Sequence, residues 1–237
     1  PNFLIIFFGF YGVFEADIFA VRQSIAIAIG VLSYLSIINR RFIHFGVFIA
    51  VGTLFHWTIL GFIPAYFIYN YPNNFKKIII ATFGILFLYF IKIQDLIFTF
   101  ILRYVAGVDA NSAIGAKIQF YSQNSDSVDK LSVLGILIRT ILIIYFAFLL
   151  TKSKKDKFLN GLINIYVLGF FIYIILGSTF IVFVRLSWYY SFVEVILLAY
   201  SLKFFKLKHE KFAVYLVISL YFGLRITQNI TAQAYLK

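Results

Sequence analysis

The chain has no cysteine and no methionine, and only three of its 237 residues are proline. Without cysteine there is no disulfide framework, no thiolate nucleophile and no cysteine-ligated metal site. Charge is scarce as well, because 13% of the residues are Asp, Glu, Lys or Arg, and only nine are acidic. So little charge, beside 62% hydrophobic residues and a mean hydropathy of +0.95, excludes an ordinary soluble domain.

Long apolar runs recur along the whole chain, which predicts an all-α, polytopic integral membrane protein. One run extends from Ile18 to Ile38, where Arg22 is the only charged side chain. That run is long enough to cross the hydrocarbon core of a bilayer. We expect about eight transmembrane helices plus a re-entrant helical hairpin, all in a single transmembrane domain over residues 1–237.

The basic residues set the expected orientation in the bilayer. Twelve of the 21 Lys and Arg residues fall in four clusters, at 40–41, 76–77, 152–157 and 203–211. The positive-inside rule assigns such clusters to the cytoplasm. The net charge of +12 therefore reflects topology and contact with anionic lipid rather than nucleic-acid binding. Arg22 precedes Arg40 by about 27 Å along a helix, so we expect Arg22 at the outer face.

The hairpin is predicted from the two basic clusters that flank residues 42–75. If both clusters are cytoplasmic, an even number of passages lies between them. The two arms, 43–55 and 57–69, are each about 20 Å long as helices, which is short of the roughly 30 Å core. We expect a re-entrant or tilted hairpin with its apex at His56-Trp57. A single helix that leaves Lys76-Lys77 outside is the alternative.

An amphipathic helix is predicted to begin at Ile93, with apolar residues on one face and Gln94 and Asp95 on the other. The one long polar segment follows, over 105–130, and we expect it to be an extracytoplasmic loop. Its Asp109 is a candidate base for deprotonating a sugar hydroxyl. The alternative is that the carboxylates of this loop only keep the loop hydrated.

Three side chains are expected to converge at the outer face: Arg22, His56 and Arg185. Arginine binds a diphosphate through a planar, permanently charged fork, and the head group of a lipid diphosphate lies at the interface. The alternative is that both arginines are interfacial anchors. His56 is either a catalytic or substrate-contacting residue or a hydrogen-bonded structural one.

Two charges are expected deep inside the spans, Arg139 and Glu194, and we predict a structural ion pair between them. Three aromatic residues are candidates for stacking on sugar rings, although the same residue types form interfacial belts without a ligand; they are Tyr121, Trp188 and Tyr189. The outer carboxylates are scattered and no Asp-x-Asp motif occurs, so neither a metal nor a cofactor is implied.

Two blocks of sequence resemble the EpsG family of Wzy-like bacterial exopolysaccharide polymerases. The first runs from Arg22-Gln23 through a helix rich in small residues and a basic turn to Phe55-His56 and an apolar run with Pro64. The second is Arg185-Leu-Ser-Trp-Tyr-Tyr, which leads into another apolar helix. The chain opens at Pro1 without an initiator Met and stops near a hydrophobic helix, so both ends look truncated relative to the family.

The resemblance implies a GT-C-like fold and a metal-independent glycosyltransferase of the bacterial inner membrane. Its substrate would be an oligosaccharide on a polyprenyl (undecaprenyl) diphosphate, polymerised into exopolysaccharide, capsule or O-antigen beside other polysaccharide-assembly proteins. Arg22, Gln23 and Arg185 would hold the diphosphate, and His56 or Asp109 would take the hydroxyl proton. The alternatives are a flippase of lipid-linked sugars, which would need a counterpart site on the inner side, and a structural subunit of a synthase complex.

Overall fold

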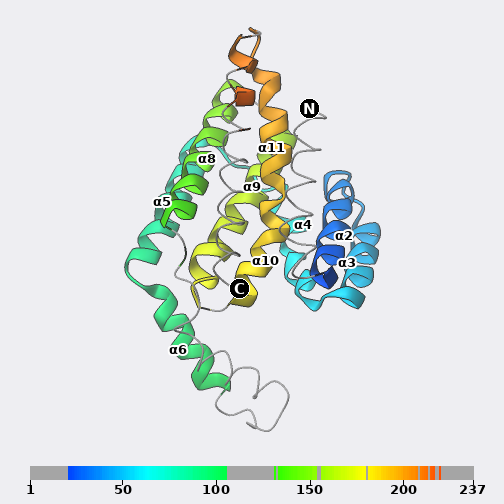
Figure 1. Cartoon of the computed structure of the whole chain (residues 1–237), viewed down its shortest axis with the longest axis vertical. Helices are drawn as coiled ribbons and strands as arrows, with labels where there is room; N and C mark the ends of the chain where they lie inside the picture. The colour runs from blue at the N-terminus through cyan, green and yellow to red at the C-terminus, as the bar shows by residue number, and fades with distance from the viewer. Residues whose placement is uncertain are drawn as a thin grey trace, which may run out of the picture.

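The fold is seen in a computed structural model, which describes residues 21–105, 131, 133–153, 156–179, 181–207, 209–212, 214–216 and 219. Within these residues every regular element is helical and there is no strand. The longer helices run side by side in Figure 1, and α6 projects away from the others at one end. The elements are α2 (Val21–Ile38), α3 (Phe42–Phe55), η2 (Trp57–Phe62), α4 (Pro64–Ile68), α5 (Phe75–Phe90), α6 (Ile93–Val105), α8 (Val133–Lys152), α9 (Lys157–Phe171), η4 (Ile172–Leu176), α10 (Ile181–Ser191), α11 (Val193–Ser201) and η5 (Leu202–Phe204).

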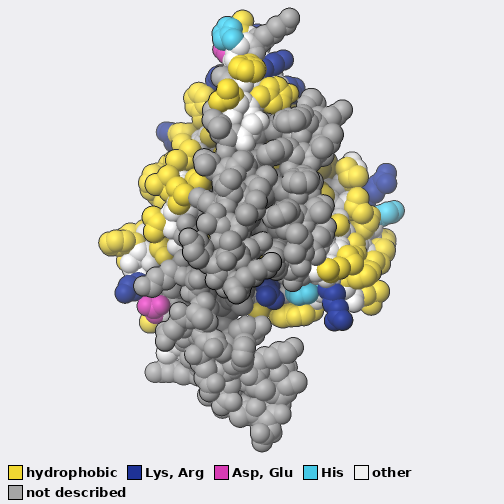
Figure 2. Space-filling view, viewed as in Figure 1, with side chains coloured by type: hydrophobic (Ala, Val, Ile, Leu, Met, Phe, Trp, Pro, Cys, Tyr) yellow, Lys and Arg dark blue, Asp and Glu magenta, His cyan; other side chains and the backbone are white. Residues whose placement is uncertain are grey.

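Four helical stretches are long and apolar enough to cross a membrane: Val21–Ile38, Val133–Lys152, Lys157–Leu176 and Val182–Phe204. Their outer surfaces carry large exposed apolar side chains, and Figure 2 shows broad hydrophobic areas over the α2–α3 side and the α5–α8 side. The chain is therefore a multi-pass membrane protein. The segments 3–14 and most of 212–229 lie outside the described residues, so the number of about eight spans stays a prediction.

The chain folds back on itself at His56, where the backbone is extended between α3 and the 3-10 helix η2. The two arms run in opposite directions, because the Phe42 ring at the start of α3 lies 5.3 Å from the Tyr66 ring in α4. Arg40 also donates to the Tyr66 carbonyl at 2.6 Å. The break at His56 is confirmed, and the depth of this hairpin in the membrane stays a prediction.

Helical spacing predicts that Arg22, Ala26, Gly30 and Ser33 share one face of α2; Ala26, Gly30 and Ser33 are buried, whereas Arg22 is exposed. A Cβ at Gly30 would lie 3.0 Å from Cδ1 of Tyr189 in α10. This close approach of α2 to α10 places the start of α2 beside Arg185.

The apolar runs predict one span over 158–182 and another over 186–202, with Arg185 outside the membrane between them, but the first helix ends earlier than that. It continues from α9 into the π-helix η4 and stops at Leu176, and α10 then begins at Ile181. Gly177 allows the turn, because a Cβ there would lie 2.3 Å from the Tyr173 carbonyl oxygen. The placement of Arg185 between two helices is therefore wrong, and this residue lies in the second turn of α10.

Gly169→Ala should destabilise the fold by about 1–3 kcal/mol, because the new Cβ would lie 2.4 Å from Cβ of Tyr190, an atom that cannot move without the backbone. We expect the melting temperature in detergent to fall by at least about 3 °C. Gly84→Ala is the matched control, since nothing lies within 4 Å of its Cβ position, and it should melt at or above the wild-type temperature. Equal melting of the two variants would show that α9 and α10 are not packed this closely.

Candidate functional site

Three segments that are far apart in the sequence meet at one end of the fold: the first turn of α2, the break at His56, and the first half of α10. The Gln23 side-chain amide donates to the Arg185 carbonyl at 3.3 Å. The Tyr189 hydroxyl lies 3.3 Å from Thr58 Oγ1, which itself lies 2.6 Å from His56 Nδ1. These contacts bring Gln23, His56 and Arg185 into one region of the fold, whereas the convergence of Arg22, His56 and Arg185 at the outer face stays a prediction.

Gln23 is the buried member of the Arg-Gln pair, with 2% of its surface exposed. Its Nε2 donates to the Arg185 carbonyl oxygen, whereas its buried Oε1 has no hydrogen-bond partner. An unsatisfied buried acceptor costs about 1–3 kcal/mol and calls for a donor. A sugar hydroxyl is one group that would supply it.

The two arginines of the predicted site differ in their surroundings. Arg185 is half-buried on α10, whereas Arg22 is exposed although the next residue, Gln23, is buried. Arg185 is therefore the arginine that the packing holds next to His56, and Arg22 keeps the freedom to approach a ligand from the side.

The position of His56 is fixed by the hydrogen bonds of its Nδ1 atom. The backbone N–H of Thr58 donates to Nδ1 at 3.4 Å, so this nitrogen carries a lone pair. In the neutral ring the proton is then on Nε2, and Nε2 acts as a donor. The arrangement favours His56 as a hydrogen-bond donor to an oxygen of the substrate.

The charge state of His56 agrees with this assignment. His56 lies outside the four long spans, and partial burial lowers its pKa below the usual value. The positive charge of Arg185 lowers this pKa further. His56 is therefore neutral at pH 7, which leaves the positive charge of the site on the arginines.

The aromatic residues predicted for sugar stacking are not equivalent. Tyr189 is 1% exposed and its ring packs 6.1 Å from the Phe62 ring. Its contribution to the site is therefore the contact of its hydroxyl with Thr58. Trp188 is half-buried and Trp57 is 63% exposed, so both indoles have surface available for a ligand. Asp109 and Tyr121 lie outside the described residues.

Arg139 and Glu194 are both buried, as predicted, with 6% and 3% of their surfaces exposed. The guanidinium carbon of Arg139 lies 3.9 Å from the centre of the Tyr173 ring, a cation–π contact. Glu194 accepts a hydrogen bond of 2.7 Å from the Tyr166 hydroxyl. Each charge thus has a tyrosine neighbour, and the ion pair between them stays a prediction.

Two residues that build the site, Tyr34 and Thr58, were not singled out from the sequence, whereas Tyr190 belongs to the Tyr-Tyr pair of the second block. Tyr190 donates to the Gly61 carbonyl at 2.5 Å and Tyr34 donates to the Tyr189 carbonyl at 2.5 Å. These bonds tie η2 and α2 to α10, and Thr58 joins His56 to Tyr189. Only the position of Thr58, two residues after a histidine at a helix break, is a signal that the sequence contains.

No group of three or more His, Asp or Glu side chains suited to a metal occurs among the described residues. The chemistry that the described site offers is therefore charge and hydrogen-bond donation. It comes from Arg185, the Nε2 of His56 and the Gln23 amide, with Arg22 nearby.

The sequence profile of the EpsG family matches residues 1–237. The chain belongs to the EpsG family. This family is linked to exopolysaccharide biosynthesis, and the predicted resemblance is thereby confirmed over the whole chain. Neither the curated proteins nor the solved structures include a match to this EpsG-family chain.

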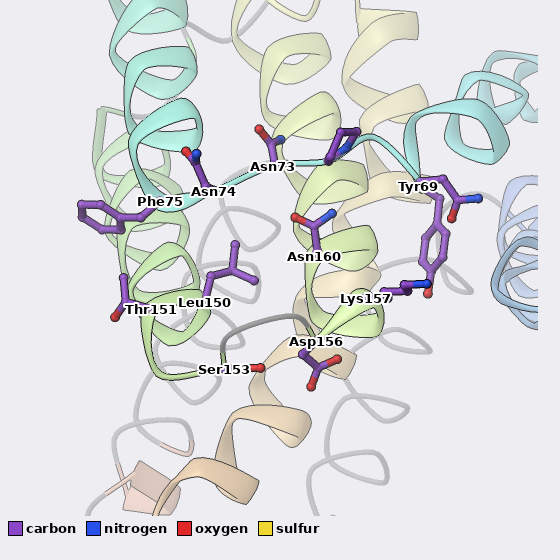
Figure 3. Close-up of a pocket in the computed structure, with 12 residues that line it drawn as sticks. Tyr69, Asn73, Asn74, Phe75, Leu150, Thr151, Ser153, Asp156, Lys157 and Asn160 are labelled. Carbon is purple, nitrogen blue, oxygen red and sulfur yellow. The ribbon is translucent and has the colours of Figure 1, made fainter.

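A cavity of about 850 Å3 lies at the other end of this EpsG-family fold. It is bounded by the linker before α5, the end of α8 and the start of α9, and it borders the basic clusters at 76–77 and 152–157. Figure 3 shows Asn73 and Asn74 on one side, Ser153 and Asp156 on the other, and Asn160 between them. The positive-inside rule predicts that this cavity faces the cytoplasmic side.

Proposed function

We propose that the protein is a glycosyltransferase that polymerises a glycan carried on a polyprenyl diphosphate, at the outer face of the bacterial inner membrane. The observation that carries the proposal is the meeting of Arg185, Gln23 and His56 at the end of the fold opposite the basic clusters. Membership of the EpsG family supports the link to exopolysaccharide.

In this proposal the diphosphate is held by Arg22 and Arg185. Arginine presents paired N–H donors that match phosphate oxygens, and the diphosphate gains negative charge as it leaves. The hydroxyl oxygen of the acceptor sugar attacks the anomeric carbon, and the bond from that carbon to the diphosphate oxygen breaks. The lipid diphosphate departs as the electron pair moves onto its oxygen.

His56 and Asp109 are the two residues proposed to handle the hydroxyl proton. The hydrogen bonds of His56 Nδ1 favour a donor role for this ring, which would bind a phosphate or sugar oxygen through Nε2. Asp109 is then the proposed base, since a carboxylate accepts a proton directly. Trp188 and Trp57 are the proposed platforms for sugar rings.

The fold that we propose around this site has about eight spans, with the segment 42–68 as a re-entrant hairpin whose apex at His56 reaches the outer leaflet. The antiparallel arms of α3 and α4 support the hairpin. The 105–130 loop is placed on the same outer side.

The test of this function is an assay of purified protein in detergent with a polyprenyl-diphosphate-linked repeat unit. Detergent removes the two sides of the membrane, so a polymerase makes polymer there whereas a flippase has no measurable product. We expect a ladder of glycan lengths to form. Absence of any polymer from folded protein would refute the proposed activity.

Transport of lipid-linked sugars is the second candidate function, and the cavity at the basic end of the fold is the observation that favours it. A transporter binds its substrate from both sides and therefore needs such an inner site. Proteoliposomes loaded with the repeat unit distinguish the two functions, because a transporter would move the lipid across the bilayer with no change in glycan length.

The proposed topology predicts the side from which introduced cysteines react. The chain has no cysteine of its own, so Ser125→Cys and Ser153→Cys each provide one thiol. In intact cells a membrane-impermeant maleimide should label Ser125→Cys, and it should label Ser153→Cys only after the membrane is opened. Labelling of both from the same side would contradict the topology on which the outer site depends.

A further inference from the structure

The wall of the cavity at the basic end is held together by hydrogen bonds between its own residues. The amides of Asn160 and Asn164 both donate to the Tyr71 carbonyl, at 2.9 and 2.7 Å. Asn73 donates to the side-chain oxygen of Asn164 at 2.7 Å. These bonds attach the linker before α5 to α9, and the Tyr69 ring fills the space left by Gly161. The cavity is therefore preorganised, and binding does not have to order its wall.

Among the described residues the lining contains one carboxylate and one ammonium group, on neighbouring residues. Asp156 caps α9 by accepting the Leu159 N–H at 3.1 Å, and its second oxygen accepts the Tyr200 hydroxyl at 2.6 Å. Lys157 is exposed at the first position of α9. These two side chains are the charged members of the lining among the described residues, and together they suit a ligand that carries both signs.

The unsatisfied atom of the cavity wall calls for a hydrogen-bond donor. Asn160 lines the cavity, and its buried Oδ1 has no hydrogen-bond partner. A phosphate has no proton to give it at neutral pH, and a quaternary ammonium has none either. A primary ammonium group has three N–H donors.

The cavity lies where lipid head groups lie. Lys76 and Lys77 stand at the start of α5 beside it, and these basic residues mark the cytoplasmic interface. Phe75 and Leu150 form apolar parts of the lining, so the cavity offers an apolar surface to the upper part of an acyl chain.

We propose that this cavity binds the head group of an inner-leaflet phospholipid that carries a phosphate and a primary amine, of the phosphatidylethanolamine type. The phosphate lies at Lys157, and the ammonium lies at Asp156 and Asn160. A polyprenyl diphosphate fits less well, because its several negative charges would meet the Asp156 carboxylate.

The test is native mass spectrometry of the full-length protein with three lipids of equal chain length: dioleoyl phosphatidylethanolamine, phosphatidylcholine and phosphatidylglycerol. We expect phosphatidylethanolamine to be retained over phosphatidylcholine by roughly tenfold, the ratio expected for one charge-assisted hydrogen bond. We expect it to be retained over phosphatidylglycerol as well, because that lipid is anionic and lacks the amine.

Two variants connect this preference to the cavity. Asp156→Asn keeps the helix cap, because asparagine caps as well as aspartate, and it should abolish the preference for the ethanolamine lipid. Lys157→Gln should lower retention of the ethanolamine and choline lipids alike. Glu210→Gln and Lys206→Gln remove the same charges outside the cavity lining and should bind lipid as the wild type does.

The proposal is overturned if the three lipids bind equally, or if Asp156→Asn keeps the full preference for the ethanolamine lipid. Stronger retention of phosphatidylglycerol would make the cavity an anionic-lipid site instead. Saturable binding of a polyprenyl diphosphate there, abolished by Lys157→Gln, would also refute it and would strengthen the case for transport.

Discussion

Arg185→Lys should lower polymer formation by roughly 100-fold while expression and membrane insertion stay normal. The substitution keeps the positive charge but replaces the planar fork with a compact ammonium group, so one of two parallel hydrogen bonds to the diphosphate is lost. Arg185 is half-buried next to His56, and a lysine held at the same position has a different reach. The rate of chain growth in the detergent assay measures the loss.

Arg22→Lys is expected to lower the rate in the same direction, although less, because Arg22 is exposed and less constrained by its surroundings. Arg41→Lys is the matched control, since Arg41 is an exposed arginine in the basic turn at the other end of α2. It should polymerise at the wild-type rate. Wild-type rates in the Arg185 and Arg22 variants together would make both residues membrane anchors.

Replacement of His56 should separate hydrogen-bond donation from base catalysis. Glutamine offers an N–H near the position of Nε2 but cannot act as a base, whereas phenylalanine keeps only the ring shape. If His56 is a donor, His56→Gln should retain activity within about tenfold of the wild type, and His56→Phe should lose considerably more. Loss of about 100-fold or more in both variants would instead identify His56 as the base.

The pH dependence of the wild type gives a second measure of the same role. The pKa of His56 is lowered, so the ring becomes protonated only as the pH falls below its usual value of about 6.5. Nε2 donates in both the neutral and the protonated ring, so the donor role predicts profiles of the same shape for wild type and His56→Gln. An acidic limb that disappears in His56→Gln would contradict it.

The helical spans could be predicted from the sequence because they follow from local composition, whereas their orientation stays a prediction from the basic clusters. Apolar runs of about 20 residues report spans wherever they occur, and clusters such as 152–157 report the cytoplasmic side. The break at His56 was predictable for the same reason, since two arms too short to cross a bilayer must turn somewhere between them. The structure confirms that break.

The contacts that build the site could not be predicted, because they depend on which helix faces which. Tyr34, Tyr189 and Tyr190 resemble belt residues in a chain with 21% aromatics, yet all three are buried and connect helices through their hydroxyls. The end of the α9–η4 helix at Leu176 was missed as well, because the apolar run continues past Gly177 without a charge.

The asparagines at the basic end were missed for another reason. Asn160 and Asn164 stand in an apolar helix, where the sequence gives no indication of a partner. In the fold both amides hold the carbonyls of a linker about 90 residues away along the chain, and the cavity exists because of them. Polar residues in a membrane span predict a buried hydrogen bond, but the sequence does not show which residue is the partner, because that depends on how the helices pack.

The central claim, that Arg185 and His56 line a diphosphate site, is tested most directly by the fluorescence of the two tryptophans. The chain has no others, and Trp57 follows His56 while Trp188 lies one helical turn after Arg185. Titration with a polyprenyl diphosphate should change the emission saturably, a polyprenyl monophosphate should bind at least about tenfold more weakly, and Arg185→Lys should remove this difference. Equal binding of both lipids by wild type and Arg185→Lys would contradict the account.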